Sequence, residues 1–481
     1  MARGFKNAAR FFQVGWTLGR YDALFFLRGA PKKYTRLHFW IGILSTLAPT
    51  KSSIKSLEPG ARLAKALNIL GPAYIKLGQT FATRSDLVGD ETAAHLRLLQ
   101  DSLPSVPTDE IIAAIEADQE KSIDELFSHF DPEPKAAASI AQVHFAVTKE
   151  GEEVAVKVLR PGIEEAMARD IESFEWLAGI FEKYMARARR LKLKEVVATL
   201  KETVTVELDL RMEAAAATEL AENMKTEKGY RIPRIDWART SRRVLTMERV
   251  KGTPIHEYKN KKKAKKISET IVRVFLTQAI RDGFFHADLH QGNFFIETDG
   301  TLVAVDFGIM GRLDKPSRKY LAEILWGFHS RNYQLIADVH FQAGYVPKDQ
   351  SRELFAQAMR ALAEPIMDRP LKEVSPGDFL LQMFRTAEKF SMETQPQLLT
   401  LQRSMVMVEG LALTLDKDVN MWAISKPVLE NWAGGLFGPG AKFAEAIEIL
   451  KSFLKLLPDF TGLLRAILTE FEKRMAPKKA A

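Results

Sequence analysis

His286-Ala287-Asp288-Leu289-His290-Gln291-Gly292-Asn293 is followed, thirteen residues after Asn293, by Asp306-Phe307-Gly308. Phosphoryl transfer from ATP needs carboxylate and amide oxygens that hold Mg²⁺ on the phosphates, and a group that orients the proton of the nucleophile. We predict that Asp288 is this catalytic group and that Asn293 and Asp306 are the metal ligands. The tripeptide at Asp306 alone would be weak evidence, but its spacing from the first motif favours a phosphotransferase site. His290 is expected to be a hydrogen-bonded loop residue.

A candidate lysine lies upstream on a predicted strand, Glu153-Val154-Ala155-Val156-Lys157-Val158, of the V-A-I-K type. Burying an unpaired ammonium group costs on the order of several kcal/mol, so Lys157 needs an anionic partner. Phosphates and one glutamate would provide it. Glu207, Asp209 and Glu213 are the candidates, and analogy with kinases favours Glu213.

The stretch before this strand, Lys135-Ala136-Ala137-Ala138-Ser139-Ile140-Ala141-Gln142-Val143, contains no glycine. An ordinary kinase covers the ATP phosphates with a glycine-rich loop at this place. Alanine resists a positive φ by ~1 kcal/mol or more, so this loop is expected to be stiffer and to approach phosphate differently.

Four motifs, in the order in which they follow one another along the chain, resemble those of the UbiB or AarF family of atypical kinases, which are linked to ubiquinone biosynthesis. Residues 71–79 resemble the KxGQ helix of the family, and residues 136–144 resemble its alanine-rich loop. The segment that contains Glu207, Asp209 and Glu213 resembles its ExD helix, and the catalytic loop and DFG motif complete the set. The sequence departs from the family at Ala141, where glycine is usual, and at Gln291, where proline is usual.

The resemblance implies an α+β, bilobal protein-kinase-like fold with an N-terminal helical extension and an α-rich C-terminal lobe. It implies that the KxGQ helix folds over the nucleotide cleft, with Lys76 near Glu207 and Asp209, and so disfavours protein substrates. Gln79 belongs to the same regulatory motif. No Ala-Pro-Glu follows the DFG motif, which also argues against a peptide-docking platform. The predicted nucleotide-binding residues are Ala137, Ala138, Ser139, Val143, Lys157, Glu248 and Val250.

The predicted domains are a basic, aromatic segment (1–60), a KxGQ helical extension (61–108), a kinase-like N-lobe with inserted helices (109–252) and a helical C-lobe (253–481). Strands are predicted at 143–148, 153–159, 231–236, 243–250, 293–296 and 302–306, with a two-residue turn at Asp299 and Gly300. Helices are predicted at 61–100, 163–224 and 265–282, and in most of the chain beyond residue 315.

The composition excludes some kinds of chemistry and favours contact with an anionic membrane surface. The absence of cysteine excludes disulfides and thiol nucleophiles, and it favours an intracellular protein. Eight Lys or Arg and one acid occur among the first fifty residues, together with many aromatic residues. This mixture suits an anionic membrane surface, although a helix that packs its aromatic residues inward and a transit peptide are alternatives.

No signal peptide or membrane-spanning run is predicted, and peripheral association of a cytoplasmic protein with the inner membrane is expected. The apolar residues of the segment 453–464 are an alternative membrane face, although core packing is the favoured interpretation. The lysine run at 259–266 is interpreted as a solvated loop and helix start rather than as a nucleic-acid or lipid contact.

Three functions are compatible with these residues. The favoured one is a Mg²⁺-dependent ATPase or small-molecule kinase that supports isoprenoid-quinone biosynthesis. Its expected partners are ATP, a lipid or quinone intermediate, an anionic membrane surface and quinone-biosynthesis enzymes, without nucleic acid. The alternatives are a nucleotide-binding scaffold for biosynthetic enzymes and, least favoured, a protein kinase.

Overall fold

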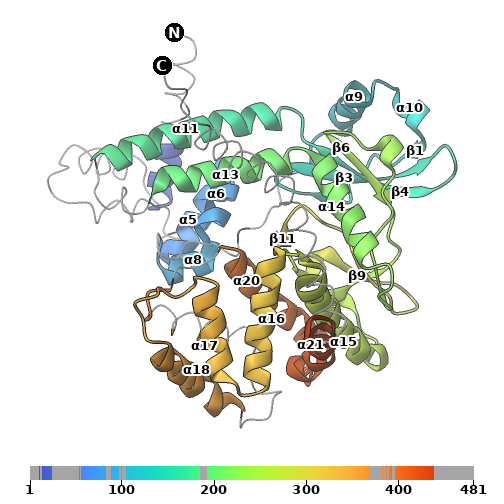
Figure 1. Ribbon diagram of the computed structural model, residues 1–481. Helices are drawn as coiled ribbons and strands as arrows, with labels where there is room; N and C mark the ends of the chain where they lie inside the picture. The colour runs from blue at the N-terminus through green and yellow to red at the C-terminus, as the bar shows by residue number, and fades with distance from the viewer. Residues whose placement is uncertain are drawn as a thin grey trace, which may run out of the picture. The chain divides into compact units, whose positions relative to one another are not determined.

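The computed structural model describes residues 13–23, 56–82, 88–96, 104–184, 192–367, 389–392 and 396–437, together with Arg10, Ile54, Leu99, Gln382 and Thr386. The chain divides into two compact units, and the described residues form hydrophobic clusters within the first unit and within the second. Figure 1 shows the helices and strands of the chain. The first unit comprises the described residues up to Ala221, Ile232–Lys251 and Val305–Gly308. The second comprises Glu222–Arg231, Gly252–Ala304 and the described residues from Ile309 onward.

The first unit begins with a group of helices: α5 (Pro59–Leu70), α6 (Pro72–Ala82) and α8 (Asp90–Leu96). Proline suits the first turn of α5 and α6, where the backbone N–H that it lacks has no helical partner. Gly71 separates the two helices with a φ of 102°, a backbone conformation that other residues rarely adopt. The helices pack through Leu63, Leu67, Leu70 and Tyr74, which form one buried cluster with residues of later helices.

An antiparallel sheet in the same unit has the order β1-β3-β4-β6, and β2 pairs with β3. The strands are β1 (Phe127–Phe130), β2 (Ala136–Ala137), β3 (Ala141–Thr148), β4 (Glu153–Leu159) and β6 (Val244–Glu248). Alternate residues of β4 are buried, and Val154, Val156 and Val158 pack with Ile111 and Ile115. The last two belong to α9 (Thr108–Gln119), which is followed by α10 (Ile123–Leu126).

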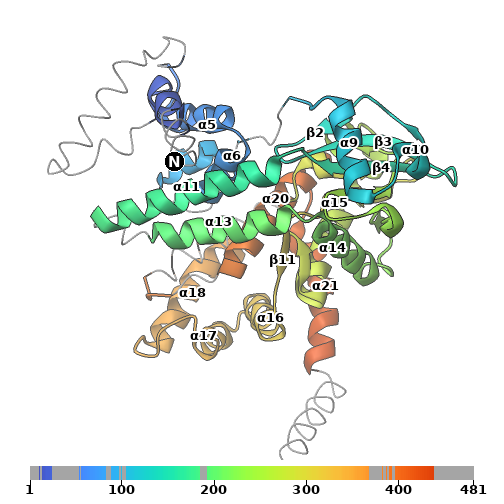
Figure 2. The same cartoon turned by 90° about the horizontal axis from the view of Figure 1, so that it is seen from above.

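The helical stretch predicted at 163–224 consists of three long helices. They are α11 (Ile163–Tyr184), α13 (Leu193–Glu207) and α14 (Leu210–Asn223), and residues 185–191 lie outside the described part. Figures 1 and 2 show α11 and α13 side by side, and the two helices are in contact. The helix predicted across residues 208–209 is interrupted because Asp209 accepts a hydrogen bond from the N–H of Arg211 and begins a new helix.

The second unit contains a sheet of the order β5-β10-β9-β7 and the antiparallel pair β8-β11. Its strands are β5 (Tyr230–Arg231), β7 (Thr253–Pro254), β8 (Phe284–His286), β9 (Phe294–Ile296), β10 (Leu302–Ala304) and β11 (Met310–Arg312). The predicted hairpin joins β9 to β10, but its loop has three residues (298–300) in place of the predicted two, because the N–H of Glu297 donates to the carbonyl of Thr301 at 2.9 Å. The strand predicted at 231–236 is reduced to β5 and an isolated bridge between Ile235 and Met247, both of which belong to the first unit.

Helices form the rest of the second unit. They are α15 (Lys261–Leu276), α16 (Lys315–His329), α17 (Tyr333–Gln342), α18 (Arg352–Met367), α20 (Pro396–Leu415) and α21 (Met421–Phe437). Short helical turns occur at Ile255–Glu257, Thr277–Asp282 and Gln291–Asn293, and in the first unit at Trp237–Arg239. The helices α16, α17 and α18 pack in succession around Ile336, Phe355 and Met359.

One helix in the described part of the chain, Gln397–Leu415 within α20, has the length and apolar composition that a membrane span requires. A single helix of this kind is weak evidence for a span, because a core helix of a soluble protein meets the same criteria. In the structure α20 packs against α15, and the hydroxyl of Ser268 donates to the carbonyl of Ala412 at 3.1 Å. This contact is typical of a helix that belongs to the fold of its unit.

The basic N-terminal segment is described only in part, and Arg3, Lys6 and the aromatic residues from Phe25 to Trp40 lie outside the described residues. Arg10 is engaged within the protein, because its guanidinium donates to both oxygens of Asp170 at 3.0 and 2.8 Å. Leu18 and Tyr21 pack against the buried helical cluster. The described portion therefore follows the inward-packing alternative, and the segment 453–464 is outside the described residues.

Candidate functional site

The first group of candidate residues surrounds Lys157, which lies on the central strand β4 between Val143 and Leu245. Its ammonium group is 2.8 Å from each carboxylate oxygen of Glu213 and 3.4 Å from Oδ2 of Asp306. The side chain of Glu213 is 6% exposed, whereas that of Asp306 is 42% exposed. The structure thus brings together three residues that are far apart in sequence, with one carboxylate open to solvent.

The electrostatic balance keeps Lys157 charged. Burial lowers the pKa of its ammonium group, but the carboxylates of Asp306 and Glu213 outweigh this effect and raise the pKa above its ordinary value. A charged lysine with one buried and one exposed carboxylate neighbour can contact an additional anion at its exposed side. This arrangement suits a phosphate group.

The DFG segment is held by the same carboxylate that holds the lysine. The N–H of Phe307 donates to Oε1 of Glu213 at 3.4 Å, and the Phe307 ring is almost fully buried. The N–H of Gly308 donates to Oδ1 of Asp306 at 3.0 Å. These contacts fix the backbone on both sides of Phe307 and orient the exposed carboxylate of Asp306.

The alanine-rich loop forms a tight hairpin between β2 and β3. Ala136 pairs with Val143 and Ala137 pairs with Gln142. No residue from Lys135 to Val143, a stretch that is described throughout, has a positive φ. The loop is therefore built without the backbone conformations for which a glycine-rich loop uses glycine.

The regulatory residues of the KxGQ helix lie on α6. The ammonium group of Lys76 is 2.9 Å from Oε2 of Glu207, and these two side chains are only 9% and 8% exposed. A Cβ atom at Gly78 would lie 2.4 Å from a terminal methyl of Leu99 and 2.8 Å from one of Leu67, so a larger residue here would have to displace these side chains. Gln79 is half-buried on the same helix.

Asp209 makes its ion pair with Arg211, at 2.6 Å. The resemblance implied that both acids of the ExD segment lie near Lys76, and the structure places Glu207 there and pairs Asp209 with its own neighbour. The exposed guanidinium of Arg211 also holds the pKa of the Asp209 carboxyl below its usual range, because it donates hydrogen bonds to the carboxylate.

The second group of candidate residues belongs to the second unit and surrounds Asp288. The amide nitrogen of Asn293 donates to the carbonyl of Asp288 at 3.1 Å and to its carboxylate at 3.5 Å. These bonds leave the amide oxygen of Asn293 as the atom that can bind a cation. Asn293 is 6% exposed, and the side chain of Asp288 is 28% exposed.

Two histidines flank Asp288. Nδ1 of the buried His286 accepts from the N–H of Asp288 at 3.1 Å. His290 is half-exposed, and its Nδ1 accepts from the N–H of Gly292 at 3.0 Å, as expected for a hydrogen-bonded loop residue. The backbone at the candidate catalytic residue is therefore fixed by the side chain two residues before it.

Sequence reasoning missed the residue that supports His286. Gln278 lies in a wide helical turn, Thr277–Asp282, that continues α15, and its Oε1 accepts from the N–H of His286 at 3.1 Å. Gln278 is buried, with 2% exposure. A buried glutamine inside an apolar helix is a signal in principle, but its partner could not be named from spacing.

The last two predicted nucleotide-binding residues lie at and beyond the end of β6. Glu248 and Val250 are both half-buried, and a carboxylate oxygen of Glu248 accepts from the N–H of Arg234 at 3.2 Å. Their contact with a nucleotide stays a prediction.

The predicted metal ligands are Asp306 in the first unit and Asn293 in the second. Among the described residues, no three or more His, Asp or Glu side chains gather into a cluster that could hold a metal ion. Mg²⁺ at ATP sites is bound by one or two carboxylates together with phosphates and water, so a dedicated cluster is not required. The exposed carboxylate of Asp306 and the amide oxygen of Asn293 are the type of oxygen that this ion prefers.

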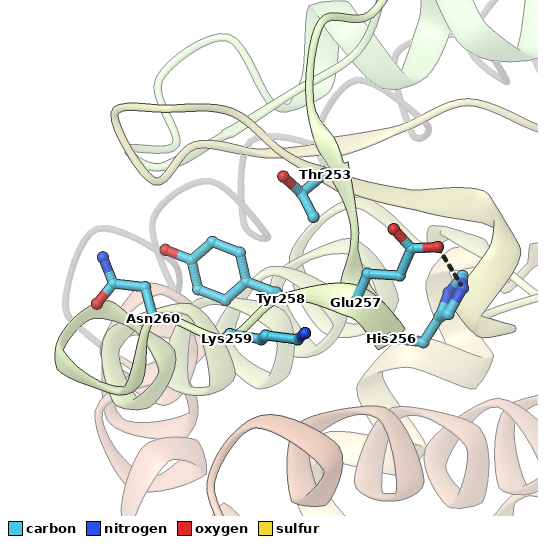
Figure 3. A pocket seen from close by; sticks show the side chains of 6 residues that line it. All are labelled: Thr253, His256, Glu257, Tyr258, Lys259 and Asn260. Carbon is cyan, nitrogen blue, oxygen red and sulfur yellow. Dashed lines mark ion pairs between the residues drawn. The ribbon is translucent and has the colours of Figure 1, made fainter.

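An open hollow of about 600 Å³ lies elsewhere in the second unit (Figure 3). It is lined by Thr253, His256, Glu257, Tyr258, Lys259 and Asn260. The only ion pair drawn among these side chains joins His256 to Glu257, at 3.5 Å. None of the predicted nucleotide or metal residues lines it, so it gives no support to the candidate site.

Comparison with known proteins adds an independent finding. Residues 98–340 match the ABC1 atypical kinase-like domain, and residues 359–420 match the UbiB helical domain. The "Probable protein kinase UbiB" of Marinobacter nauticus is 39% identical over 470 residues, which are 96% of this chain and 85% of that protein. A protein of the same name from Pseudomonas putida (strain F1) is 39% identical over 443 residues, 90% of this chain and 81% of that protein.

A solved structure is also similar. The structure of Rv3197 from Mycobacterium tuberculosis, in complex with erythromycin, matches with a TM-score of 0.54 and 25% sequence identity. The match covers 75% of this chain and 93% of that chain.

Proposed function

Since the chain belongs to the UbiB family of atypical kinases and has an α+β, protein-kinase-like fold, we propose that it binds Mg-ATP and transfers or hydrolyses its terminal phosphate. We further propose that this activity supports ubiquinone biosynthesis at a membrane surface. The acceptor in this proposal is water or a small molecule rather than a protein.

The observation that carries the proposal is the contact of Lys157 with Glu213 and Asp306. A lysine on a buried strand would be satisfied by Glu213 alone. The second carboxylate adds negative charge at the open side of the pair, which is useful when a cation and phosphates bind there. A purely structural ion pair between Lys157 and Glu213 would not need the exposed carboxylate of Asp306 beside it.

The residues have separate roles in this proposal. Lys157 binds phosphate oxygens, and Glu213 keeps its ammonium group in position. Asp306 and Asn293 hold Mg²⁺, which supplies positive charge that stabilises the phosphates during transfer. Asp288 accepts or orients the proton of the nucleophile, and its backbone is fixed by His286.

Restricted turnover follows from the two features that distinguish this chain from an ordinary protein kinase. The loop contains alanine in place of glycine, and the KxGQ helix is anchored by the buried ion pair of Lys76 with Glu207. Both features disfavour rapid exchange of substrates. A lipid or quinone intermediate as acceptor, an anionic membrane surface and quinone-biosynthesis enzymes as partners belong to this proposal.

The experiment that tests the cellular role is a profile of quinones and their precursors in cells that lack the gene. We expect loss of ubiquinone and accumulation of an early precursor, restored by the wild-type gene but not by Asp306→Asn. Asp299→Asn is a matched control, because Asp299 caps the hairpin turn through Thr301 and has no role in the proposed site. A normal quinone profile in the deletion strain would refute the proposed role.

A further inference from the structure

The tip of the alanine-rich loop is held by a residue that follows the lysine strand. The N–H of Ala138 donates to the carbonyl of Ala141 at 2.8 Å and closes a turn over Ser139 and Ile140. The carbonyl of Ala138 accepts from Nε of Arg160 at 3.0 Å. The carbonyl of Ile140 accepts from the backbone N–H of Arg160 at 2.9 Å. One residue therefore binds two carbonyls of the turn.

The same arginine reaches a third segment of the first unit. Its Nη1 donates to the carbonyl of Pro104 at 2.8 Å. Two residues further on, the N–H and carbonyl of Val106 bond to the side chain of Gln142, at 2.8 and 3.2 Å. Gln142 is fully buried and adjoins the turn. The segment 104–106, near the end of the KxGQ extension (61–108), is thus fastened to the loop twice.

A loop that binds phosphates must point its N–H groups at the anion and turn its carbonyl oxygens away, because carbonyl oxygens carry partial negative charge. Glycine-rich loops reach such shapes through positive φ angles, which this loop does not use. Arg160 holds the carbonyl of Ala138 with its side chain and the carbonyl of Ile140 with its backbone N–H, so both oxygens are bound within the protein. The planar fork of its side chain fixes two acceptors at once, the carbonyls of Ala138 and Pro104, which the single ammonium group of lysine cannot do in the same geometry.

We propose that Arg160 is a positioning residue that holds the alanine-rich loop in its nucleotide-binding shape and couples it to the linker at Pro104. The proposal rests on the proposed function in one respect, namely that a nucleotide is the ligand of the loop. Arg160 follows β4 directly and stands three residues after Lys157. The end of one strand therefore carries both the residue that binds phosphate and the residue that shapes the loop.

The test uses the full chain with Arg160→Met, which removes the side-chain donors to Ala138 and Pro104 but keeps the backbone bond to Ile140, and Arg160→Lys, which keeps a charge but not the fork. Binding of Mg-ADP and of a non-hydrolysable Mg-ATP analogue is measured by calorimetry. We expect Arg160→Met to weaken binding by about tenfold or more and Arg160→Lys to recover part of the loss. Hydrogen exchange of the loop amides is measured without nucleotide, and we expect faster exchange at residues 138–141 in Arg160→Met.

Arg239→Met is the matched control. Arg239 also belongs to the first unit and donates to the carbonyl of Leu126, but it pairs with Asp236 and with Glu150, which follows β3 at the strand end opposite the loop. Its loss should lower stability and leave both nucleotide affinity and exchange of the loop unchanged. This separates positioning of the loop from general destabilisation.

The outcomes distinguish the two proposals. Nucleotide affinity within twofold of wild type in Arg160→Met, or the same loss in Arg239→Met, overturns the role of Arg160. If the wild-type chain binds no nucleotide, the proposed function fails, and the exchange measurement still decides whether Arg160 holds the loop. Unchanged exchange at residues 138–141 in both Arg160 variants also overturns the inference.

Discussion

The effects of substituting Lys76 and Glu207 on the stability of the first unit should be strongly coupled, because these two side chains form an ion pair. The two side chains are 9% and 8% exposed and 2.9 Å apart, and they join α6 to α13. Removing one member leaves the other charge buried without its counter-ion, which costs about 3–5 kcal/mol in such pairs. Lys76→Met and Glu207→Met should each lower the free energy of unfolding by this order.

The double variant should be more stable than either single variant, because two methionines of similar volume replace the pair without leaving a charge. The expected coupling energy is about 2–3 kcal/mol. Urea unfolding followed by tryptophan fluorescence gives the free energies. The matched control is the pair of Lys201 with Glu175, which also connects α13 to α11 at 2.8 Å but is 56% and 44% exposed.

For Lys201→Met we expect a loss below ~1 kcal/mol, as is usual for exposed pairs. The reasoning would be refuted if Lys76→Met cost no more than Lys201→Met, or if the two single effects at Lys76 and Glu207 simply added in the double variant. Either result would mean that the KxGQ helix is not anchored by this pair.

Two further predictions concern the second unit. Burial lowers the pKa of His340 to about 4 in the folded protein. The unfolded protein therefore binds more protons than the folded protein between pH 6.5 and 4. Through this residue, acidification from pH 7 to pH 5 should lower the free energy of unfolding by about 2 kcal/mol. His340→Gln should weaken this pH dependence in urea unfolding, and an equal dependence in wild type and variant would contradict it. Gly311→Ala would place a Cβ atom 2.2 Å from the buried ring of Phe285 and should destabilise by about 1–3 kcal/mol. In the control Gly410→Ala, the added Cβ atom meets open space in α20, and the change should be neutral or stabilising by up to ~1 kcal/mol in thermal unfolding. Equal effects of the two changes would argue against the packing at Gly311.

Local sequence patterns predicted the strands in which apolar and polar residues alternate and the turns that contain Asp and Gly. The strand 153–159 is β4 with the same bounds, and a hairpin joins β9 to β10 as the turn signal indicated, although its loop has three residues (298–300) and not two. The family resemblance and the protein-kinase-like fold are confirmed by the domain matches and by relatives at 39% identity. The four motifs made this possible because their order and spacing are rarely combined by chance.

Pairings between distant segments could not be read from spacing. The parallel pair of β5 with β10 brings Tyr230 beside Leu302, and neither residue carries a signal for the other. The predicted helix 163–224 failed at Asp209 because a short polar side chain can bond the backbone and end a helix that periodicity alone extends. The Ser122-x-x-Glu125 capping box that begins α10 was readable and was missed.

Some features of the candidate site could likewise be predicted from the sequence, and others could not. Its residue types and the partner of Lys157 could be predicted, because a buried ammonium needs a carboxylate and Glu213 was a candidate. The supporting contacts of Gln278 with His286 and of Arg160 with the loop could not be predicted, because main-chain donors and acceptors leave no trace in the side-chain pattern.

The central claim is that Lys157, Glu213 and Asp306 belong to a Mg-ATP site. The most direct measurement is phosphate release from ATP by the purified chain, with and without Mg²⁺, for wild type, Asp306→Asn and the turn control Asp299→Asn. We expect turnover that requires Mg²⁺, is lost in Asp306→Asn and is retained in Asp299→Asn. Turnover of the Asp306→Asn variant at the wild-type rate would contradict it.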